Sequence, residues 1–353
     1  MTLQTEGIPG PEVRADGETY LYFGGTAYLG MQTGPQFLDL LAAHTRRLGA
    51  HWGASRMGNL TLGVYREAEA RLAFWMQSPA CLSLSSGFLA ARLVAEYLHT
   101  QGHECHFSPN CHAALLLPGH SRQATWDHLK EAVGRSLART PKKTPVVLAD
   151  TMGDGIAPGP AWELLATLPR EVILVADDSH GLGICGPGGT GSYQPLNALG
   201  FRELLLCGSL GKAMGITAGV IAGPQPRIDA LKQTPLFAGA SPAPPAGLAT
   251  LAEGLERGWY HEKFLQVSSL AAALQGQLAP SLPLQWRQGY PVLSFRSPAL
   301  ARHLRENSIL ITDFQYAAEG GTSSPSRIVI TAAHKEPHLQ QLKKVLGAFR
   351  GRE

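Results

Sequence analysis

Cysteine is scarce in this chain of 353 residues, and long hydrophobic runs are absent from it. The five cysteines are odd in number and irregularly spaced, so we expect no disulfide framework and a reducing, cytoplasmic location. No apolar run reaches the roughly 18 residues of a membrane span. Residues 1–20 are polar and lack the apolar core of a secretory signal. These absences predict a protein that is neither secreted nor held in a membrane.

An excess of one charge is also missing. The net charge is +3, and the basic residues are dispersed apart from isolated pairs such as Arg46 and Arg47. We therefore expect no surface for a nucleic acid or a lipid bilayer. Apolar residues make up 44% and charged residues 16% of the chain, which is typical of an ordinary globular protein. The length allows two domains, or one large core with an appendage.

Short apolar stretches alternate with amphipathic ones through the middle of the chain. Strands are expected at 80–85, 144–149, 172–176, 204–206 and 219–222, and helices at 37–48, 65–76, 88–99 and 161–168. This alternation predicts an α/β fold with a mostly parallel sheet that is covered on both faces. Functional sites in such sheets lie beyond the carboxyl ends of the strands. Gly87, Asp177, His180 and Lys212 all fall there.

The pattern changes after the proline-rich segment 241–245. One long helical stretch at 246–265 leads into alternating helices and strands. We therefore divide the chain into an N-terminal segment 1–34, a large domain 35–238 and a small C-terminal α/β domain 239–353.

A lysine in a glycine-rich turn, Lys212, closely follows the apolar strand 204–206. Burial of a lysine is costly unless the amine is paired or chemically used, and a desolvated amine is a good nucleophile for carbonyl groups. Another apolar strand ends in Asp177, Asp178, Ser179 and His180. A strand-end acid together with a strand-end lysine suggests pyridoxal 5'-phosphate (PLP), with the lysine as Schiff base and the acid on the ring nitrogen.

Six short motifs follow one another along the chain, at residues 28–31, 86–88, 177–181, 186–191, 208–215 and 327–334. In this order they resemble the motifs of the α-oxoamine synthases, a group of fold-type I PLP enzymes. The resemblance implies a large domain with a mostly parallel seven-stranded sheet and a homodimer with sites at the subunit interface. It also implies an acyltransferase that condenses a small amino acid with an acyl-CoA thioester to give an α-amino ketone.

The same resemblance implies roles for the residues around the cofactor ring. Lys212 would hold the cofactor and take the α-proton, and Asp177 would pair with the ring nitrogen. His180 would hydrogen-bond the phenolic oxygen, and His112 would stack on the ring. Asp178 competes with Asp177 for the ring nitrogen, but the three-residue spacing to His180 favours Asp177.

The remaining contacts implied by the resemblance concern the phosphate and the substrate. The phosphate group would be bound by residues at a helix start and in the lysine turn: Ser86, Gly87, Phe88, Ser209 and, from the second subunit, Ser241. Thr151 would lie near the phenolic side of the ring. Arg327 would clamp the substrate carboxylate. Thr26 would lie in the same pocket, where the family usually has asparagine.

Three alternatives stay open. The first is a metal site, because residues 103–112 hold three histidines and two cysteines, but the paired ligand spacing typical of zinc sites is missing and the stacking role of His112 is favoured. A PLP-dependent aminotransferase or lyase would use the same fold, although residues 148–158 lack the Asn-Pro loop common in class I aminotransferases. A non-catalytic partner subunit is the third alternative, and such subunits tend to lose the lysine that is present here as Lys212.

Overall fold

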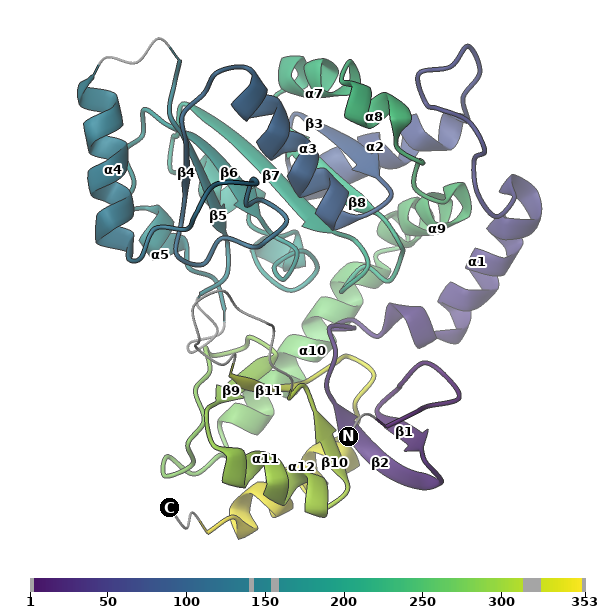
Figure 1. Ribbon diagram of the computed structural model, residues 1–353. Coiled ribbons are helices and arrows are strands. Elements are labelled where there is room, and N and C mark those ends of the chain that lie inside the picture. The colour runs from purple at the N-terminus through teal and green to yellow at the C-terminus, as the bar shows by residue number, and fades with distance from the viewer. Residues whose placement is uncertain (1–2, 140–142, 154–158, 314–324, 351–353) are drawn as a thin grey trace.

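One six-stranded sheet organises the larger part of this computed structural model, which describes residues 3–139, 143–153, 159–313 and 325–350 (Figure 1). In spatial order its strands are β3 (Ala80–Leu84), β8 (Gly219–Gly223), β7 (Glu203–Ser209), β6 (Ile173–Asp177), β5 (Val146–Asp150) and β4 (Cys105–Phe107). Strands β4 to β7 run parallel, and β8 is antiparallel to both β7 and β3. The predicted α/β fold with a mostly parallel sheet is confirmed.

The resemblance implied a sheet of seven strands, whereas the sheet formed by the described residues has six. The chain returns along the free edge of β4, where Gln123 N donates to Phe107 O at 2.9 Å. No strand forms there in the described ranges, since the segment between β4 and Gln123 turns repeatedly. Pro118 and Gly119, the latter with φ +77°, belong to one of these turns. A proline lacks the N–H that a continued ladder would need.

Both faces of the sheet are buried under helices. Along β6, Ile173 and Val175 pack into one hydrophobic cluster, and Leu174 and Ala176 into the other, as the two-residue period of a strand requires. The first face is covered by α3 (Gly87–Thr100), α7 (Gln225–Lys232) and α8 (Pro235–Gly239). The second is covered by α2 (Gly63–Met76), α4 (Trp126–Ala138), α5 (Trp162–Leu165) and α6 (Tyr193–Asn197). Each fully buried aliphatic side chain stabilises this core by about 1.5–3 kcal/mol.

The helices predicted at 37–48, 65–76, 88–99 and 161–168 are found, the last as the shorter α5. The helix predicted over 246–265 is wrong as a single element. The structure has α9 (Pro245–Glu256) and α10 (Trp259–Gln275) instead. Gly258 lies between them with φ +74°, a left-handed conformation that ends one helix and starts the next.

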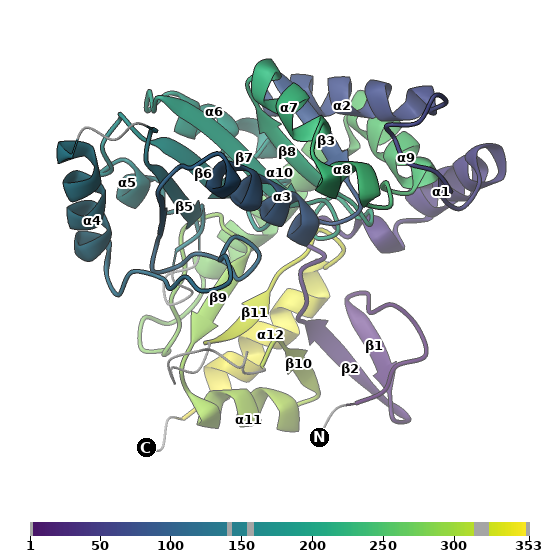
Figure 2. The same ribbon diagram turned by 45° about the horizontal axis from the view of Figure 1, so that its top comes forward.

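A smaller body lies below the sheet in Figures 1 and 2. Its three-stranded sheet joins β1 (Glu12–Ala15) and β2 (Glu18–Phe23) to β10 (Ile309–Ile311), so the N-terminal segment pairs with the C-terminal part. β9 (Val292–Phe295) and β11 (Ser326–Val329) form an antiparallel pair. The body also holds α11 (Pro298–Glu306) and α12 (Glu336–Ala348).

Two helices connect the bodies. Helix α9 packs against α2 and α1 (Pro35–Leu48), while α10 leads into the smaller body and packs on α12. The division after residue 238 stays a prediction. Short 3-10 turns occur at Met31–Thr33 and Pro187–Gly189.

All five cysteine thiols are free in the structure. Among the described residues, no helix combines the length and apolar character needed to cross a bilayer.

Candidate active site

Lys212 and His180 are in direct contact at the carboxyl end of the sheet. His180 follows β6 and Lys212 follows β7, and these strands are parallel neighbours. Lys212 Nζ lies 2.8 Å from His180 Nε2. On the other side of the imidazole, Tyr28 Oη lies 2.9 Å from Nδ1. Three segments that are far apart in the sequence thus meet through one histidine ring.

The surroundings of Lys212 favour its neutral amine. Burial lowers the pKa of Lys212, although Asp177 and Asp150 act in the opposite direction. Burial also lowers the pKa of His180 well below its usual value, and Lys212 reinforces this effect. A neutral amine in such a place is a nucleophile and a base. The arrangement supports the chemistry that the sequence predicted for Lys212.

Two carboxylates stand side by side at the ends of β5 and β6. Asp177 is 3% exposed, and its Oδ1 accepts a hydrogen bond from Ser179 N at 2.9 Å. Asp150 is its direct partner in the strand register. Burial, and then Asp177, raise the pKa of Asp150 well above its usual value. The sequence reasoning missed Asp150, although it carries the same signal as Asp177, an acid at the end of an apolar strand.

Asp178 points into the protein instead. Its carboxylate accepts hydrogen bonds from Thr151 Oγ1 at 2.6 Å, Ser192 N at 2.8 Å and Ser192 Oγ at 2.6 Å. Burial raises its pKa to about 6. Asp178 therefore fastens the loop after β6, whereas Asp177 stays beside Lys212. The hydroxyl hydrogen of Thr151 is used in this contact, so any contact of Thr151 with a cofactor would have to use its oxygen as an acceptor.

The start of α3 is pressed against the end of β7. A Cβ on Gly87 would lie 2.6 Å from Ser209 Cα, so only glycine fits here. Ser86 caps the helix, with Oγ accepting from Leu89 N at 3.1 Å, and Ser209 Oγ accepts from Gly211 N at 3.1 Å. The first N–H groups of α3 have no partner within the helix and suit an anion such as a phosphate. Phe88 directs its side chain outward and is 55% exposed.

His112 lies at the opening of this cluster. It is exposed, and its Nδ1 accepts a hydrogen bond from Ala114 N at 3.2 Å. Partial desolvation lowers the pKa of His112, while the charge of Asp177 raises it. Its ring is therefore near the acid expected at the cofactor's nitrogen. In the described part of the chain, no three His, Cys, Asp or Glu side chains are grouped so that they could hold a metal ion.

Arg327 reaches the cluster from β11 of the smaller body. Its Nε is buried without a hydrogen-bond partner in the structure. Its charge lowers the pKa of both Lys212 and His180, although burial is the larger cause for each. An unpartnered buried guanidinium nitrogen is costly unless a ligand satisfies it. This orphaned donor is what a substrate carboxylate would require.

The other predicted residues lie further out. Thr26 is half-buried in the segment before Tyr28. Ser241 is exposed and lines a shallow depression with Arg56 and Phe237. Most of the loop before Arg327, residues 314–324, lies outside the described residues, as do 154–158.

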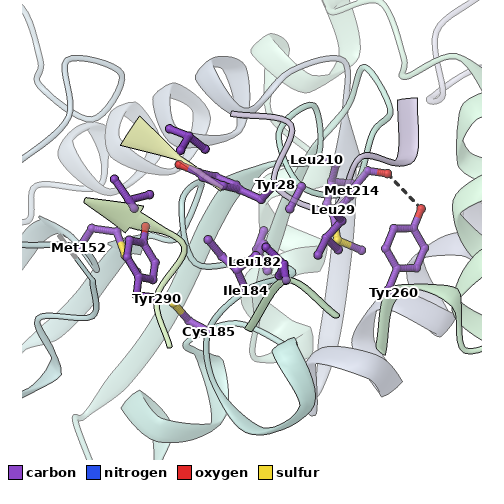
Figure 3. Packing of buried hydrophobic residues seen from close by; sticks show 14 of the residues in the cluster. Tyr28, Leu29, Met152, Leu182, Ile184, Cys185, Leu210, Met214, Tyr260 and Tyr290 are labelled. Atoms are coloured by element: carbon purple, nitrogen blue, oxygen red, sulfur yellow. Dashed lines mark hydrogen bonds between the residues drawn. The ribbon is translucent and has the colours of Figure 1, made fainter. Parts of the chain in front are cut away.

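Apolar side chains pack around two tyrosines, Tyr28 and Tyr290, that both contact His180 (Figure 3). Leu182, Ile184 and Cys185 from the loop after β6 pack beneath Tyr28 and Tyr290. Tyr290 Oη donates to the backbone oxygen of His180 at 3.3 Å. The sequence reasoning gave no role to Tyr290, because nothing in the sequence around it indicates a site.

These residues fit PLP. Lys212 offers the amine, Asp177 an acid for the ring nitrogen, and His180 a ring that faces the amine. The close approach of Gly87 to Ser209 leaves helix N–H groups beside the lysine turn for the phosphate. The buried Nε of Arg327, which has no hydrogen-bond partner in the structure, could donate to a substrate carboxylate in the same cluster.

Comparison with known proteins agrees with this set of residues. The family described as aminotransferase class I and II matches residues 110–346 of the chain. The chain belongs to this family. The 8-amino-7-oxononanoate synthase of Pseudomonas fluorescens is 30% identical over 357 residues, which cover 96% of this chain and 89% of the relative. The 8-amino-7-oxononanoate synthase of Halorhodospira halophila is 29% identical over 362 residues, which cover 95% of this chain and 87% of the relative.

A solved structure shows the same fold. Serine palmitoyltransferase from S. paucimobilis, with a bound PLP–myriocin aldimine, matches with a TM-score of 0.82 at 19% identity. The match covers 98% of this chain and 92% of that one. The 8-amino-7-oxononanoate synthase relatives, together with this fold, confirm the resemblance to the α-oxoamine synthases.

Proposed function

We propose that this protein is a PLP-dependent acyltransferase that joins a small amino acid to an acyl-CoA thioester and yields an α-amino ketone. The observation that carries the proposal is the contact of Lys212 with His180, 2.8 Å apart at the strand ends and next to Asp177. This places a nucleophilic amine, an acid and a neutral imidazole around one space. Glycine, alanine and serine are the amino acids we favour.

PLP, when bound, withdraws electrons from the α-carbon of an amino acid and so stabilises a negative charge there. Lys212 would hold the cofactor, and Asp177 would keep its ring nitrogen protonated. The start of α3, with Gly87 and Ser209, would bind the phosphate. His112 would cover the ring from the open side.

Arg327 would orient the amino acid by pairing with its carboxylate, because a guanidinium can donate two parallel hydrogen bonds to one carboxylate. Lys212 Nζ would then accept the α-proton, for which its lowered pKa suits it. A carbon–carbon bond would form between the α-carbon and the acyl carbonyl carbon as the carbon–sulfur bond breaks, and CoA would leave as a thiolate that takes a proton from water. The bond from the α-carbon to the carboxylate would then break with release of carbon dioxide. The α-carbon would take back a proton from Lys212 Nζ, which gives the α-amino ketone.

The names of the relatives support this reaction. An 8-amino-7-oxononanoate carries its amino group on the carbon beside a ketone, which is an α-amino ketone. We extend this product class, and not the individual product, to the present chain.

We also propose a homodimer in the cytoplasm with each site completed by the partner subunit. Phe88 supports the dimer, because a large aromatic side chain beside the phosphate-side turn is left 55% exposed in one copy of the chain. Ser241 is exposed as well, and it is our candidate for the hydroxyl that the partner contributes to the phosphate.

Transamination is the second candidate, and the family described as aminotransferase class I and II is the observation in its favour. The two candidates differ in the fate of the amino group. An aminotransferase leaves it on the cofactor, whereas the proposed condensation leaves it on the product.

A spectral titration tests the proposal. The protein loaded with PLP should show the visible absorbance of lysine-bound cofactor, change it with one amino acid, and release a thiol only when an acyl-CoA is added as well. Lys212→Ala should lose this absorbance and slow turnover by at least about 100-fold, because the proton acceptor is gone. Lys263→Ala is the matched control, since Lys263 hydrogen-bonds Gln266 on the surface of α10. Conversion of the cofactor to its amine form without thiol release would replace the proposal by transamination.

A further inference from the structure

We infer that Tyr28 is a positioning residue that fixes which nitrogen of the His180 ring carries the proton. The inference rests on the function proposed above, since it concerns the face that His180 presents to the cofactor. Its basis is a continuous line of contacts: Tyr28 Oη to Nδ1 at 2.9 Å, and Nε2 to Lys212 Nζ at 2.8 Å. Tyr28 is not among the residues proposed to contact the cofactor, so this role is separate from theirs.

The packing of Tyr28 makes the contact rigid. The side chain is 2% exposed, and its ring meets the His180 ring edge-on, with centroids 6.2 Å apart and planes at 71°. Its backbone oxygen accepts from Ala332 N at 2.9 Å, which joins the segment before α1 to the one after β11. The close packing restricts rotation of the phenol, and the backbone hydrogen bond fixes the position from which it reaches the imidazole.

The proton inventory favours Tyr28 as the donor. Burial raises the pKa of Tyr28, so the phenol keeps its hydrogen. Burial lowers the pKa of His180, so the ring carries a single hydrogen. If Tyr28 donates to Nδ1, that hydrogen sits on Nε2, which faces Lys212. His180 then offers a donor to the cofactor oxygen, as the proposed function requires.

The other groups around Tyr28 leave this assignment intact. The titratable and charged neighbours that act on its pKa or on that of His180 are Lys212, Arg327, His112, Cys185, Asp150 and Tyr290. Tyr290 contacts His180 through the backbone oxygen and not the ring, and its hydroxyl also acts on the Tyr28 phenol and lowers the pKa of Tyr28. Tyr290→Phe removes these two contacts and leaves the contact of Tyr28 with the ring nitrogen in place, so it serves as the control.

Tyr28→Phe and Tyr290→Phe, each loaded with PLP and labelled with ¹⁵N-histidine, test the inference. Side-chain ¹⁵N shifts report the protonated ring nitrogen, and His180→Gln identifies the signal. In the unaltered protein and in Tyr290→Phe, the hydrogen of His180 should be on Nε2. In Tyr28→Phe it should be shared between both nitrogens or move to Nδ1. Retention of the cofactor should weaken by about 3- to 10-fold, the effect of one hydrogen bond.

Kinetics give a second readout. Tyr28→Phe should lower kcat more than it changes the KM of the amino acid, while circular dichroism shows the same folded state. An unchanged His180 signal in Tyr28→Phe would overturn the inference, and so would an equal change in Tyr290→Phe. Failure of the unaltered protein to form lysine-bound cofactor would overturn the proposed function instead, so the two failures are distinguishable.

Discussion

Adjacent acids take different tasks in this site because a strand alternates its side chains. Asp177 ends β6 beside Lys212, whereas Asp178 turns inward to Thr151 and Ser192. The second acid holds the loop, and the first stays beside Lys212. His180 likewise makes two separate contacts, because one ring nitrogen faces Tyr28 and the other faces Lys212.

A buried histidine away from the site should make stability depend on pH. His334 is 1% exposed; its Nδ1 accepts from Thr331 N at 2.9 Å, its Nε2 lies 3.1 Å from Tyr22 O, and its ring stacks on Phe23. Burial lowers its pKa from 6.5 to about 4. Between these values the unfolded chain binds a proton that the folded chain does not, so stability is lost as the pH falls. From pH 7 to pH 5 this group should cost about 2 kcal/mol.

Denaturant unfolding of the protein and of His334→Gln at both pH values checks this. The variant should have a lower free energy of unfolding than the unaltered protein at pH 7, but that free energy should fall by less between pH 7 and pH 5. His128→Gln, an exposed change on α4, should follow the unaltered protein. Equal losses in all three proteins would show that other groups cause the pH dependence.

At the scale of elements, the start of α3 depends on its distance from β7. Gly87→Ala would place a Cβ 2.6 Å from Ser209 Cα, which is backbone and cannot yield cheaply. We expect a loss of about 1–3 kcal/mol from overpacking and at least tenfold weaker PLP binding. Thermal unfolding and a cofactor titration measure the two effects.

Gly134→Ala is the control for this change. Gly134 lies in α4 with open space around its Cβ position, so the substitution should stabilise the helix by up to about 1 kcal/mol. If Gly87→Ala kept normal cofactor affinity, the start of α3 would not be the phosphate site.

At the scale of the whole molecule, the exposed ring of Phe88 is expected to lie against a second subunit. Phe88→Glu should shift the sedimentation of the protein from a dimer toward a monomer of 37.7 kDa and weaken PLP retention with it, because a buried carboxylate at an interface is unfavourable. Leu164→Glu changes another exposed apolar residue, on α5, and should leave the dimer unchanged. A monomer in the unaltered protein would refute the shared site.

The sequence predicted the strands that position Asp177 and Lys212 because their apolar runs end in unmistakable polar residues. It did not predict that Tyr28 meets His180, since 152 residues separate them and only the packed fold joins them. The prediction of a single long helix was wrong at Gly258, because the helical pattern of apolar residues resumes after this glycine and does not report its positive φ. Asp150 also ends an apolar strand, but it lies outside the six motifs that resemble the α-oxoamine synthases, so those motifs did not indicate it.

The most direct test of the central claim is mass spectrometry of the product formed by the PLP-loaded protein from glycine, alanine or serine and an acyl-CoA. We predict, for one amino acid, a product whose mass equals the two substrates less CoA and carbon dioxide, with one thiol released for each product molecule. An oxo acid derived from the amino acid, with the thioester intact, would contradict the account.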